Sequence, residues 1–324
     1  MSNSHLSIGV YCGSANPLLA EQLARRLRLP LGRRRLQQFP DGETHVQIEE
    51  SIRGRDIFIV QSTGPPVNQH VMELLIMLDA FRRAGAARIT AIIPYYGYAR
   101  QEKKSTGREP ITARLVADLL TTAGAQRVVS IDLHSPAIQG FFNIGMDHLT
   151  AVPIVTGYLQ TRLRRDSAVV SPDTGRVKLA EKYSQALGLP LVVLHKQRFT
   201  PEQPEIRAVV GDVRGKAPII IDDMISTGGT IAEAIEALLE AGAQPDITVA
   251  ATHPVLIGPA LQRLSHPAIS EVIVCDTIPV PPEKQLDKMR VLSVADLLAE
   301  TVRRLNRNES ISALFAPAYG RYAV

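Results

Sequence analysis

The chain has 324 residues, of which 45% are hydrophobic and 21% are charged, and its formal net charge is +4. This balance is typical of a globular protein of about two domains and excludes a chain that is mainly disordered. Its apolar runs are shorter than the ~18 residues of a membrane span. The mild charge gives no case for nucleic-acid binding, but it allows a local basic site for an anionic substrate.

Two further features bear on the compartment. The two cysteines, Cys12 and Cys275, cannot form a disulfide framework, which favours a reducing cytoplasm. The first residues lack a basic segment, and the apolar stretch Ile8–Tyr11 is too short for a signal peptide. We therefore expect a cytoplasmic protein.

Helical and strand patterns alternate along the chain. In order, they predict a helix over Leu18–Leu29, a strand over Ile57–Val60, a helix over Met72–Ala86, a strand starting at Ile89, a strand over Ile219–Ile221 and a helix over Ile231–Ala243. Gly85 stands where the cap of the Met72–Ala86 helix belongs. Such alternation predicts an α/β fold with mostly parallel sheets flanked by helices, and places ligands beyond the carboxyl ends of the strands.

The two halves of the chain resemble each other. The segment LAEQLARRLRLPL at Leu19–Leu31 returns about 160 residues later as LAEKYSQALGLPL at Leu179–Leu191, and two more pairs follow at nearly the same offset. This indicates a tandem duplication with domains at residues 1–150 and 151–324. The alternative is that helix–glycine–strand segments recur in any α/β protein, as the extra AGA at Ala123–Ala125 illustrates.

The clearest candidate site follows the strand Ile219–Ile221. The sequence DDMISTGGT, residues Asp222–Thr230, offers hydroxyls, backbone N–H groups and a helix N-terminus, which suit a phosphate. The adjacent carboxylates Asp222 and Asp223 suit sugar hydroxyls or Mg²⁺. An ordinary capped turn is the alternative. The corresponding loop of the first half, QSTGPP at Gln61–Pro66, lacks the carboxylates and has two prolines without N–H groups, so we expect no sugar-phosphate site there.

The loop DDMISTGGT resembles the phosphoribosyl-binding signature of the type I phosphoribosyltransferase fold. Further motifs narrow the resemblance to the ribose-phosphate diphosphokinase family, over about Ile8 to Phe315: FPDGE (Phe39–Glu43), PVNQHVMELLIMLDA (Pro66–Ala80), PYYGYARQEKK (Pro94–Lys104), REPITARLVADLL (Arg108–Leu120), DLHSPAIQGFF (Asp132–Phe142) and SPDTG (Ser171–Gly175). The resemblance implies two tandem phosphoribosyltransferase-like domains.

The resemblance also implies an activity. The family transfers the diphosphoryl group of ATP to C1 of ribose 5-phosphate, which gives 5-phosphoribosyl 1-diphosphate and AMP and requires Mg²⁺. Carried over by motif, the 5-phosphate contacts are Ser226, Thr227, Gly228, Gly229 and Thr230, the ribose contacts are Asp222 and Asp223, the ATP contacts are Asp41, Gly42, Glu43, Arg100 and Gln101, and the Mg²⁺ positions are His134 and Asp173.

For catalysis the family uses a mobile basic loop, matched here by Lys196 and Arg198, of which Arg198 would also touch substrate. Both would neutralise charge that develops in the transition state. Taken without the family, they are equally well the solvated end of a strand. Tyr95, Tyr96 and Tyr98 are expected to pack rather than to act, and His45, His70, His148 and His253 are expected to be structural.

The C-terminal segment Asn308–Phe315 resembles the tail of phosphate-activated members, in which it lines a regulatory phosphate or nucleotide site at a subunit contact. Ser310 and Ser312 would lie there, or would merely cap a terminal helix. Family resemblance implies a homohexamer. Two residues depart from the common pattern, Ser226 in place of an aspartate and Gln197 in place of a basic residue, and we expect altered affinity or metal dependence from Ser226.

Two other functions compete with the diphosphokinase. A phosphoribosyltransferase would need the phosphate loop but neither FPDGE nor YARQ. A regulatory paralogue that binds nucleotide without catalysis would be expected to lose catalytic or metal residues, and only the two departures favour it.

Overall fold

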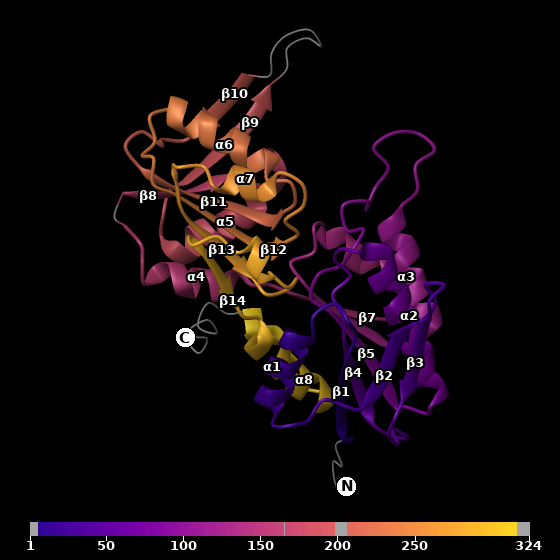
Figure 1. The fold of residues 1–324 in the computed structure, drawn as a ribbon. Coiled ribbons are helices and arrows are strands. Elements are labelled where there is room, and N and C mark those ends of the chain that lie inside the picture. The colour runs from indigo at the N-terminus through magenta and orange to yellow at the C-terminus, as the bar shows by residue number, and fades with distance from the viewer. Residues whose placement is uncertain (1–5, 165, 198–205, 316–324) are drawn as a thin grey trace. The chain divides into compact units, whose positions relative to one another are not determined.

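The structure is a computed structural model that describes residues 6–164, 166–197 and 206–315. Its contacts divide the chain into two units (Figure 1). The first contains the chain up to Thr150 together with Thr277–Pro279 and Ser293–Phe315, and the second contains Ala151–Asp276 and Val280–Leu292. The C-terminal helix thus belongs to the first unit, although a division of the chain at residue 150 would place it in the second.

The first unit has a parallel five-stranded sheet in the order β1-β4-β5-β6-β7 and a separate antiparallel pair, β2-β3. Its elements are β1 (Ile8–Cys12), α1 (Pro17–Leu27), β2 (Arg34–Gln38), β3 (Thr44–Ile48), β4 (Asp56–Val60), α2 (Val67–Arg83), β5 (Arg88–Ile93), α3 (Thr112–Ala123), β6 (Arg127–Ile131), η1 (Pro136–Phe141), β7 (Gly145–Leu149), α8 (Ala295–Asn306) and η4 (Ser312–Phe315).

The second unit has a seven-stranded sheet in the order β10-β9-β8-β11-β12-β13-β14, in which only the β9-β10 pair is antiparallel. Its elements are α4 (Val152–Gln160), β8 (Ser167–Ser171), η2 (Thr174–Arg176), α5 (Val177–Leu187), β9 (Leu191–Gln197), β10 (Ile206–Val210), β11 (Ala217–Ile225), α6 (Gly229–Glu240), β12 (Ile247–Pro254), α7 (Ala260–Leu264), β13 (Ile269–Cys275), η3 (Pro282–Lys284) and β14 (Met289–Leu292).

The two sheets repeat one topology. The parallel series β1-β4-β5-β6-β7 has its counterpart in β8-β11-β12-β13-β14, in the same order along the chain. The antiparallel pair of each half follows the helix that comes after the first strand of the series, α1 after β1 and α5 after β8, but only β9-β10 joins the main sheet. Figure 1 shows helices against each sheet. The predicted α/β fold with mostly parallel sheets is therefore confirmed, and the shared topology supports the duplication.

Local sequence explains how the first helix forms and packs. Asn16 caps α1, since its side-chain oxygen accepts from the N–H of Leu19 at 3.3 Å, and Pro17 occupies the first helical position. The apolar stripe that includes Leu19 and Leu23 is buried. The helix ends at Arg28, which adopts the left-handed conformation, and it packs against α8 within the same unit (Figure 1).

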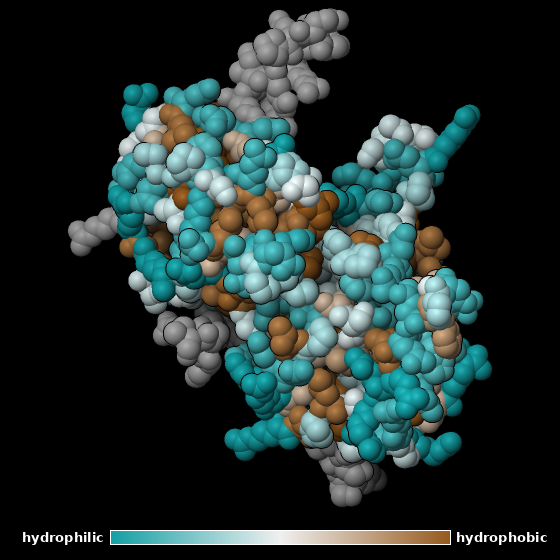
Figure 2. Space-filling model, in the orientation of Figure 1, coloured by the Kyte–Doolittle hydropathy of each residue, from teal (hydrophilic) through white to brown (hydrophobic). Residues whose placement is uncertain are grey.

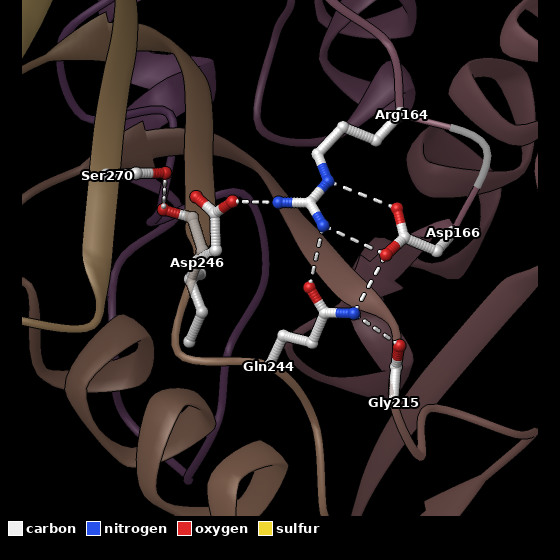
Figure 3. Close-up of polar contacts among 7 residues, drawn as sticks. Arg164, Asp166, Gly215, Gln244, Asp246 and Ser270 are labelled. Atoms are coloured by element: carbon white, nitrogen blue, oxygen red, sulfur yellow. Dashed lines mark hydrogen bonds and ion pairs between the residues drawn. The ribbon is translucent and has the colours of Figure 1, made fainter.

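A polar network ties the strands of the second unit together at their amino ends, opposite the edge where ligands are expected (Figure 3). The guanidinium of Arg164 donates to both carboxylate oxygens of Asp166, at 3.1 and 3.0 Å, to Gln244 Oε1 at 2.9 Å, and to Asp246. Gln244 in turn donates to Asp166 and to the carbonyl of Gly215. The network joins the segments that precede β8, β11 and β12, so it fixes where these strands begin.

Hydrophilic residues cover most of the face in view, where hydrophobic residues form separate patches (Figure 2). No helix among the described residues is long and apolar enough to cross a membrane.

A buried carboxylate anchors the C-terminal helix in the first unit. Asp56 is fully buried at the start of β4 and accepts hydrogen bonds from Arg88 and, at 2.9 Å, from Asn306 at the end of α8. Arg88 also donates to the carbonyl of Leu305 and to the side chain of Asn308, both at 3.1 Å. The ion pair therefore joins two strands of the sheet to the last turn of a helix that lies far away in the sequence.

We predict that Asp56→Asn destabilises the protein by about 3 kcal/mol, because it leaves the half-buried guanidinium of Arg88 without its compensating charge. Urea unfolding followed by circular dichroism measures the loss. Asp79→Asn is the control, since Asp79 pairs with Arg82 and Arg83 on the surface, and it should leave the midpoint almost unchanged. Equal losses for the two variants would contradict the anchoring role.

Candidate functional site

The strand that carries the aspartate pair is longer than the sequence pattern predicts. The expected strand ends at Ile221, but β11 continues to Ile225 and is buried throughout, so Asp222 and Asp223 lie within it rather than after it. Asp222 is in register with Ala251 of β12, and Ile225 with Pro254. The reason is that β12 continues to Pro254 and pairs with this last part of β11.

A short loop, residues 226–228, connects β11 to α6. Gly228 precedes the helix with φ of +70°, a left-handed conformation that suits glycine. Without a side chain it cannot cap the helix, so the first N–H groups of α6 keep their capacity for an anion. Arg263 of α7 donates to the carbonyl of Thr227 at 2.9 Å and holds the loop. Gly229 and Thr230 are already in the helix, which puts the whole predicted phosphate segment, including Ser226, at one strand–helix junction.

Beside this loop lies a pair of buried carboxylates. Asp222 is 9% exposed and Asp223 is 3% exposed. Burial, followed by the negative charge of Asp223, raises the pKa of Asp222 well above its ordinary range, and the nearby Arg176 opposes that rise. Arg176 Nε lies 3.3 Å from Asp222 Oδ1 and 3.2 Å from Asp223 Oδ1. The arginine thus provides a charge between the two acids, and the sequence analysis missed it.

The loop after β8 supplies the next carboxylate. Asp173 caps the short helix η2, because its Oδ1 accepts from the N–H of Arg176 at 3.1 Å. The hydroxyl of Ser171 donates to the carbonyl of Asp173 at 2.7 Å and fixes the turn. Asp173 is therefore linked through Arg176 to the aspartate pair of β11. The sequence signal that could have revealed Arg176 is its place three residues after Asp173, directly before the repeated helix.

The predicted catalytic residue Lys196 lies at the end of a strand. Lys196 belongs to β9, where it is in register with Arg207 of β10. Arg198 lies outside the described residues. Their predicted role therefore stays a prediction.

The first unit fills the corresponding position with its own side chains. Glu73 of α2 is 3% exposed and accepts from the N–H of Ser14 at 2.6 Å, from its hydroxyl at 2.8 Å, and from Gln61 Nε2 at 2.6 Å. Gln61 also accepts from the N–H of Ala15 at 3.1 Å. Gly13 admits this network, since a Cβ there would meet Gln61 at 2.3 Å. An internal carboxylate thus takes up N–H and hydroxyl donors of the β1–α1 loop.

Three predicted ATP residues form the turn between β2 and β3. The N–H of Phe39 donates to the carbonyl of Glu43 at 2.8 Å, the N–H of Glu43 to Asp41 Oδ1 at 3.1 Å, and Gly42 has φ of +96°. All three predicted residues are exposed, so the turn faces solvent. The turn reading and the ligand reading of FPDGE are therefore compatible.

Arg100 and Gln101, the other predicted ATP residues, are also exposed. They follow a backbone turn in which the N–H of Gln101 donates to the carbonyl of Tyr98 at 2.8 Å, and Gln101 Oε1 accepts from Thr112. The expected packing role of the preceding tyrosines is confirmed for Tyr95 and Tyr96, which are buried.

The predicted metal positions belong to different units. His134 follows β6 in the first unit, and Asp173 follows β8 in the second. Within the described residues, no three His, Cys, Asp or Glu side chains form a group that could hold a metal ion. Two other histidines make hydrogen bonds within the fold, which agrees with the structural role expected for them: His148 Nε2 accepts from the N–H of Leu133 at 2.8 Å, and His70 Nδ1 lies 2.8 Å from the carbonyl of Gly64.

The C-terminal serines form a small polar turn. The hydroxyls of Ser310 and Ser312 lie 3.1 Å apart, and Arg304 donates to the carbonyl of Ser310 at 2.8 Å.

Comparison with known proteins gives independent evidence on the family of this chain. Residues 8–124 match the model of the N-terminal domain of ribose phosphate pyrophosphokinase, and residues 197–316 match that of the phosphoribosyl synthetase-associated domain. A ribose-phosphate pyrophosphokinase of Caldanaerobacter subterraneus is 50% identical over 95% of this chain and 98% of its own length. That of Bacillus subtilis is 46% identical over 98% of this chain and all of its own.

The fold agrees with these relatives. The crystal structure of phosphoribosylpyrophosphate synthetase from Mycobacterium smegmatis matches with a TM-score of 0.89 and 49% identity, over 93% of this chain and 99% of that one. The chain belongs to the ribose-phosphate pyrophosphokinase family.

Proposed function

We infer that the chain is a ribose-phosphate diphosphokinase, which transfers the diphosphoryl group of ATP to C1 of ribose 5-phosphate. Relatives that are 48% to 50% identical over nearly the whole chain are ribose-phosphate pyrophosphokinases, and this similarity supports the function. On the structural side, the observation that carries it is the junction of β11 and α6, where a buried aspartate pair stands beside an uncapped helix N-terminus. A sugar phosphate has both matching parts, hydroxyls and a dianion.

The second unit would bind the sugar phosphate. We propose that the hydroxyls of Ser226, Thr227 and Thr230 and the N–H groups at Gly228 and Gly229 take the 5-phosphate. Asp222 and Asp223 would accept hydrogen bonds from the ribose hydroxyls. This arrangement fixes the ring and leaves the C1 hydroxyl as the nucleophile.

The nucleotide and metal assignments are proposals from the family match. Asp41, Gly42 and Glu43 would contact ATP together with Gln101, and Arg100 would hold phosphate. The donor set fits Mg²⁺ in part: Asp173 offers carboxylate oxygens, whereas His134 offers nitrogen and would act directly or through water. When bound, Mg²⁺ would neutralise charge on the polyphosphate.

In the reaction, the C1 oxygen of the sugar attacks the β-phosphorus of ATP, the bond from that phosphorus to the α,β-bridging oxygen breaks, and AMP leaves. Lys196 and Arg198 would neutralise the charge that develops on the transferring group and on AMP. A phosphoribosyltransferase is disfavoured, because the family similarity runs through both halves of the chain.

We propose a homo-oligomer, a hexamer by family resemblance. Exposed apolar side chains on the neighbouring helices α2 and α3 support a subunit contact: Met72 and Leu115 are each 54% exposed, and Leu119 is 40% exposed. Ser310 and Ser312 are proposed for a regulatory phosphate or nucleotide site. A cytoplasmic location is supported by Cys12 and Cys275, which form no disulfide with each other.

Purified protein should form AMP from ATP and Mg²⁺ only when ribose 5-phosphate is present. Lys196→Ala should lower kcat by at least about 100-fold and change ATP affinity less than about threefold, because its charge acts mainly in the transition state. Chromatography of AMP and nucleotide titration measure the two quantities. A variant with weak ATP binding and normal kcat would refute this role for Lys196, and AMP formed without the sugar would refute the proposed function.

Asp222→Asn should stabilise the protein while it impairs activity. In an unfolded chain Asp222 ionises near pH 4, whereas its raised pKa keeps it protonated to higher pH in the folded protein. Wild-type stability therefore falls as the pH rises through this window, and the asparagine variant escapes that loss. Its melting temperature should exceed that of the wild type by a margin that grows with pH, and its kcat/KM for ribose 5-phosphate should fall at least about tenfold.

The control for this prediction is Asp212→Asn, which removes a carboxylate that is 75% exposed in the same unit. Its melting temperature should follow that of the wild type at every pH. A lower melting temperature for Asp222→Asn across the whole range would contradict the cost assigned to the buried carboxylate.

A further inference from the structure

Arg176 connects two loops of the second unit that both carry carboxylates. Its backbone N–H donates to Asp173 Oδ1 at 3.1 Å. Its side chain, 16% exposed, places Nε within 3.3 Å of one carboxylate of β11 and 3.2 Å of the other. One residue therefore sets the β8–α5 loop against the end of β11.

The contacts fall on the two acids almost equally. Both distances end at an Oδ1 atom, and Asp222 Oδ1 also accepts from the N–H of Asp223 at 2.8 Å. These contacts orient the two carboxylates relative to the strand. A planar, permanently charged guanidinium can hold two carboxylates at once in a way that a flexible ammonium cannot.

We propose that Arg176 is a positioning residue that sets recognition of the sugar hydroxyls, and through it the preference for ribose 5-phosphate over 2-deoxyribose 5-phosphate. The proposal rests on the proposed function, because it takes Asp222 and Asp223 as the acceptors for those hydroxyls. A site built to pair with a hydroxyl rejects the analogue that lacks it, since its buried acceptors then stay unpaired. That rejection is strong only while the acceptors are held in place.

A role of Arg176 in positioning the two carboxylates and a role in general support of the fold would affect the two sugars differently. If Arg176 merely stabilised the unit, its loss would weaken both sugars equally. If it positions the acceptors, the full substrate loses more than the deoxy analogue, because the analogue already lacks one of the hydrogen bonds at stake.

The test compares Arg176→Gln with Arg176→Lys, and with Lys182→Gln as a matched control that removes an exposed charge from α5. For each protein, kcat and KM are measured with ribose 5-phosphate and with 2-deoxyribose 5-phosphate, and the binding of both sugars is measured by calorimetry without ATP. Thermal melting confirms that each variant is folded.

For Arg176→Gln we expect the KM for ribose 5-phosphate to rise at least about tenfold and that for ATP to change less than about twofold. The ratio of kcat/KM between the two sugars should narrow at least about threefold. Arg176→Lys should recover part of this ratio, and Lys182→Gln should match the wild type. If Arg176→Gln fails to fold, the lysine variant carries the test, because its ratio should still fall below that of the wild type.

An equal loss for both sugars, or an unchanged ratio in both Arg176 variants, would overturn the proposal. Calorimetry separates this result from a failure of the proposed function. A wild-type protein that binds ribose 5-phosphate more tightly than the deoxy analogue but makes no AMP refutes the diphosphokinase, while the binding ratio of the variants still decides the role of Arg176.

Discussion

Two adjacent carboxylates buried at the end of one strand are the constraint on which the second unit depends. Asp222 and Asp223 lie in β11, in a sheet whose neighbouring strands exclude water. Placing two negative charges there costs free energy, and the same burial, together with the charge of Asp223, raises the pKa of Asp222. Arg176 offsets part of that cost, and the turn held by Asp173 keeps the arginine in place. A packed core gains nothing from such a pair, whereas a sugar with neighbouring hydroxyls does.

The duplication places a different set of side chains at the same position of the first unit. In the first unit, Gln61 stands at the counterpart of Asp222, and the carboxylate of Glu73 reaches from α2 into the β1–α1 loop. The donors of that loop are used internally. In the first unit the β1–α1 loop thus satisfies its polar groups from within, whereas the second unit keeps buried carboxylates beside the uncapped N-terminus of α6. We therefore propose that only the second unit holds a sugar-phosphate site.

Much of this could be predicted from the sequence because it depends on local pattern. Short β-branched runs predicted the strands, and glycines predicted the helix ends. The segment Asp222–Thr230 predicted the strand–helix junction. The end of β11 could not be predicted, because it depends on pairing with β12, far along the chain. For the same reason the sequence does not reveal that Arg176 faces the aspartates, or that Asn306 meets Asp56.

The similarity to known proteins and the physical reading support different parts of the account. Relatives of nearly equal length establish the family and the reaction. The contacts explain why this chain keeps a costly acid pair in one half and closes the other half with Glu73. Together they support the proposal that the duplicated fold has one sugar-phosphate site.

The stoichiometry of ribose 5-phosphate binding, measured by calorimetry on the full chain with Mg²⁺ present, tests most directly whether only the second unit binds the sugar phosphate. We expect one binding site for ribose 5-phosphate per chain, and we expect it to disappear when Asp222 and Asp223 are both replaced by asparagine. Two sites per chain, or one site that survives the double replacement, would contradict it.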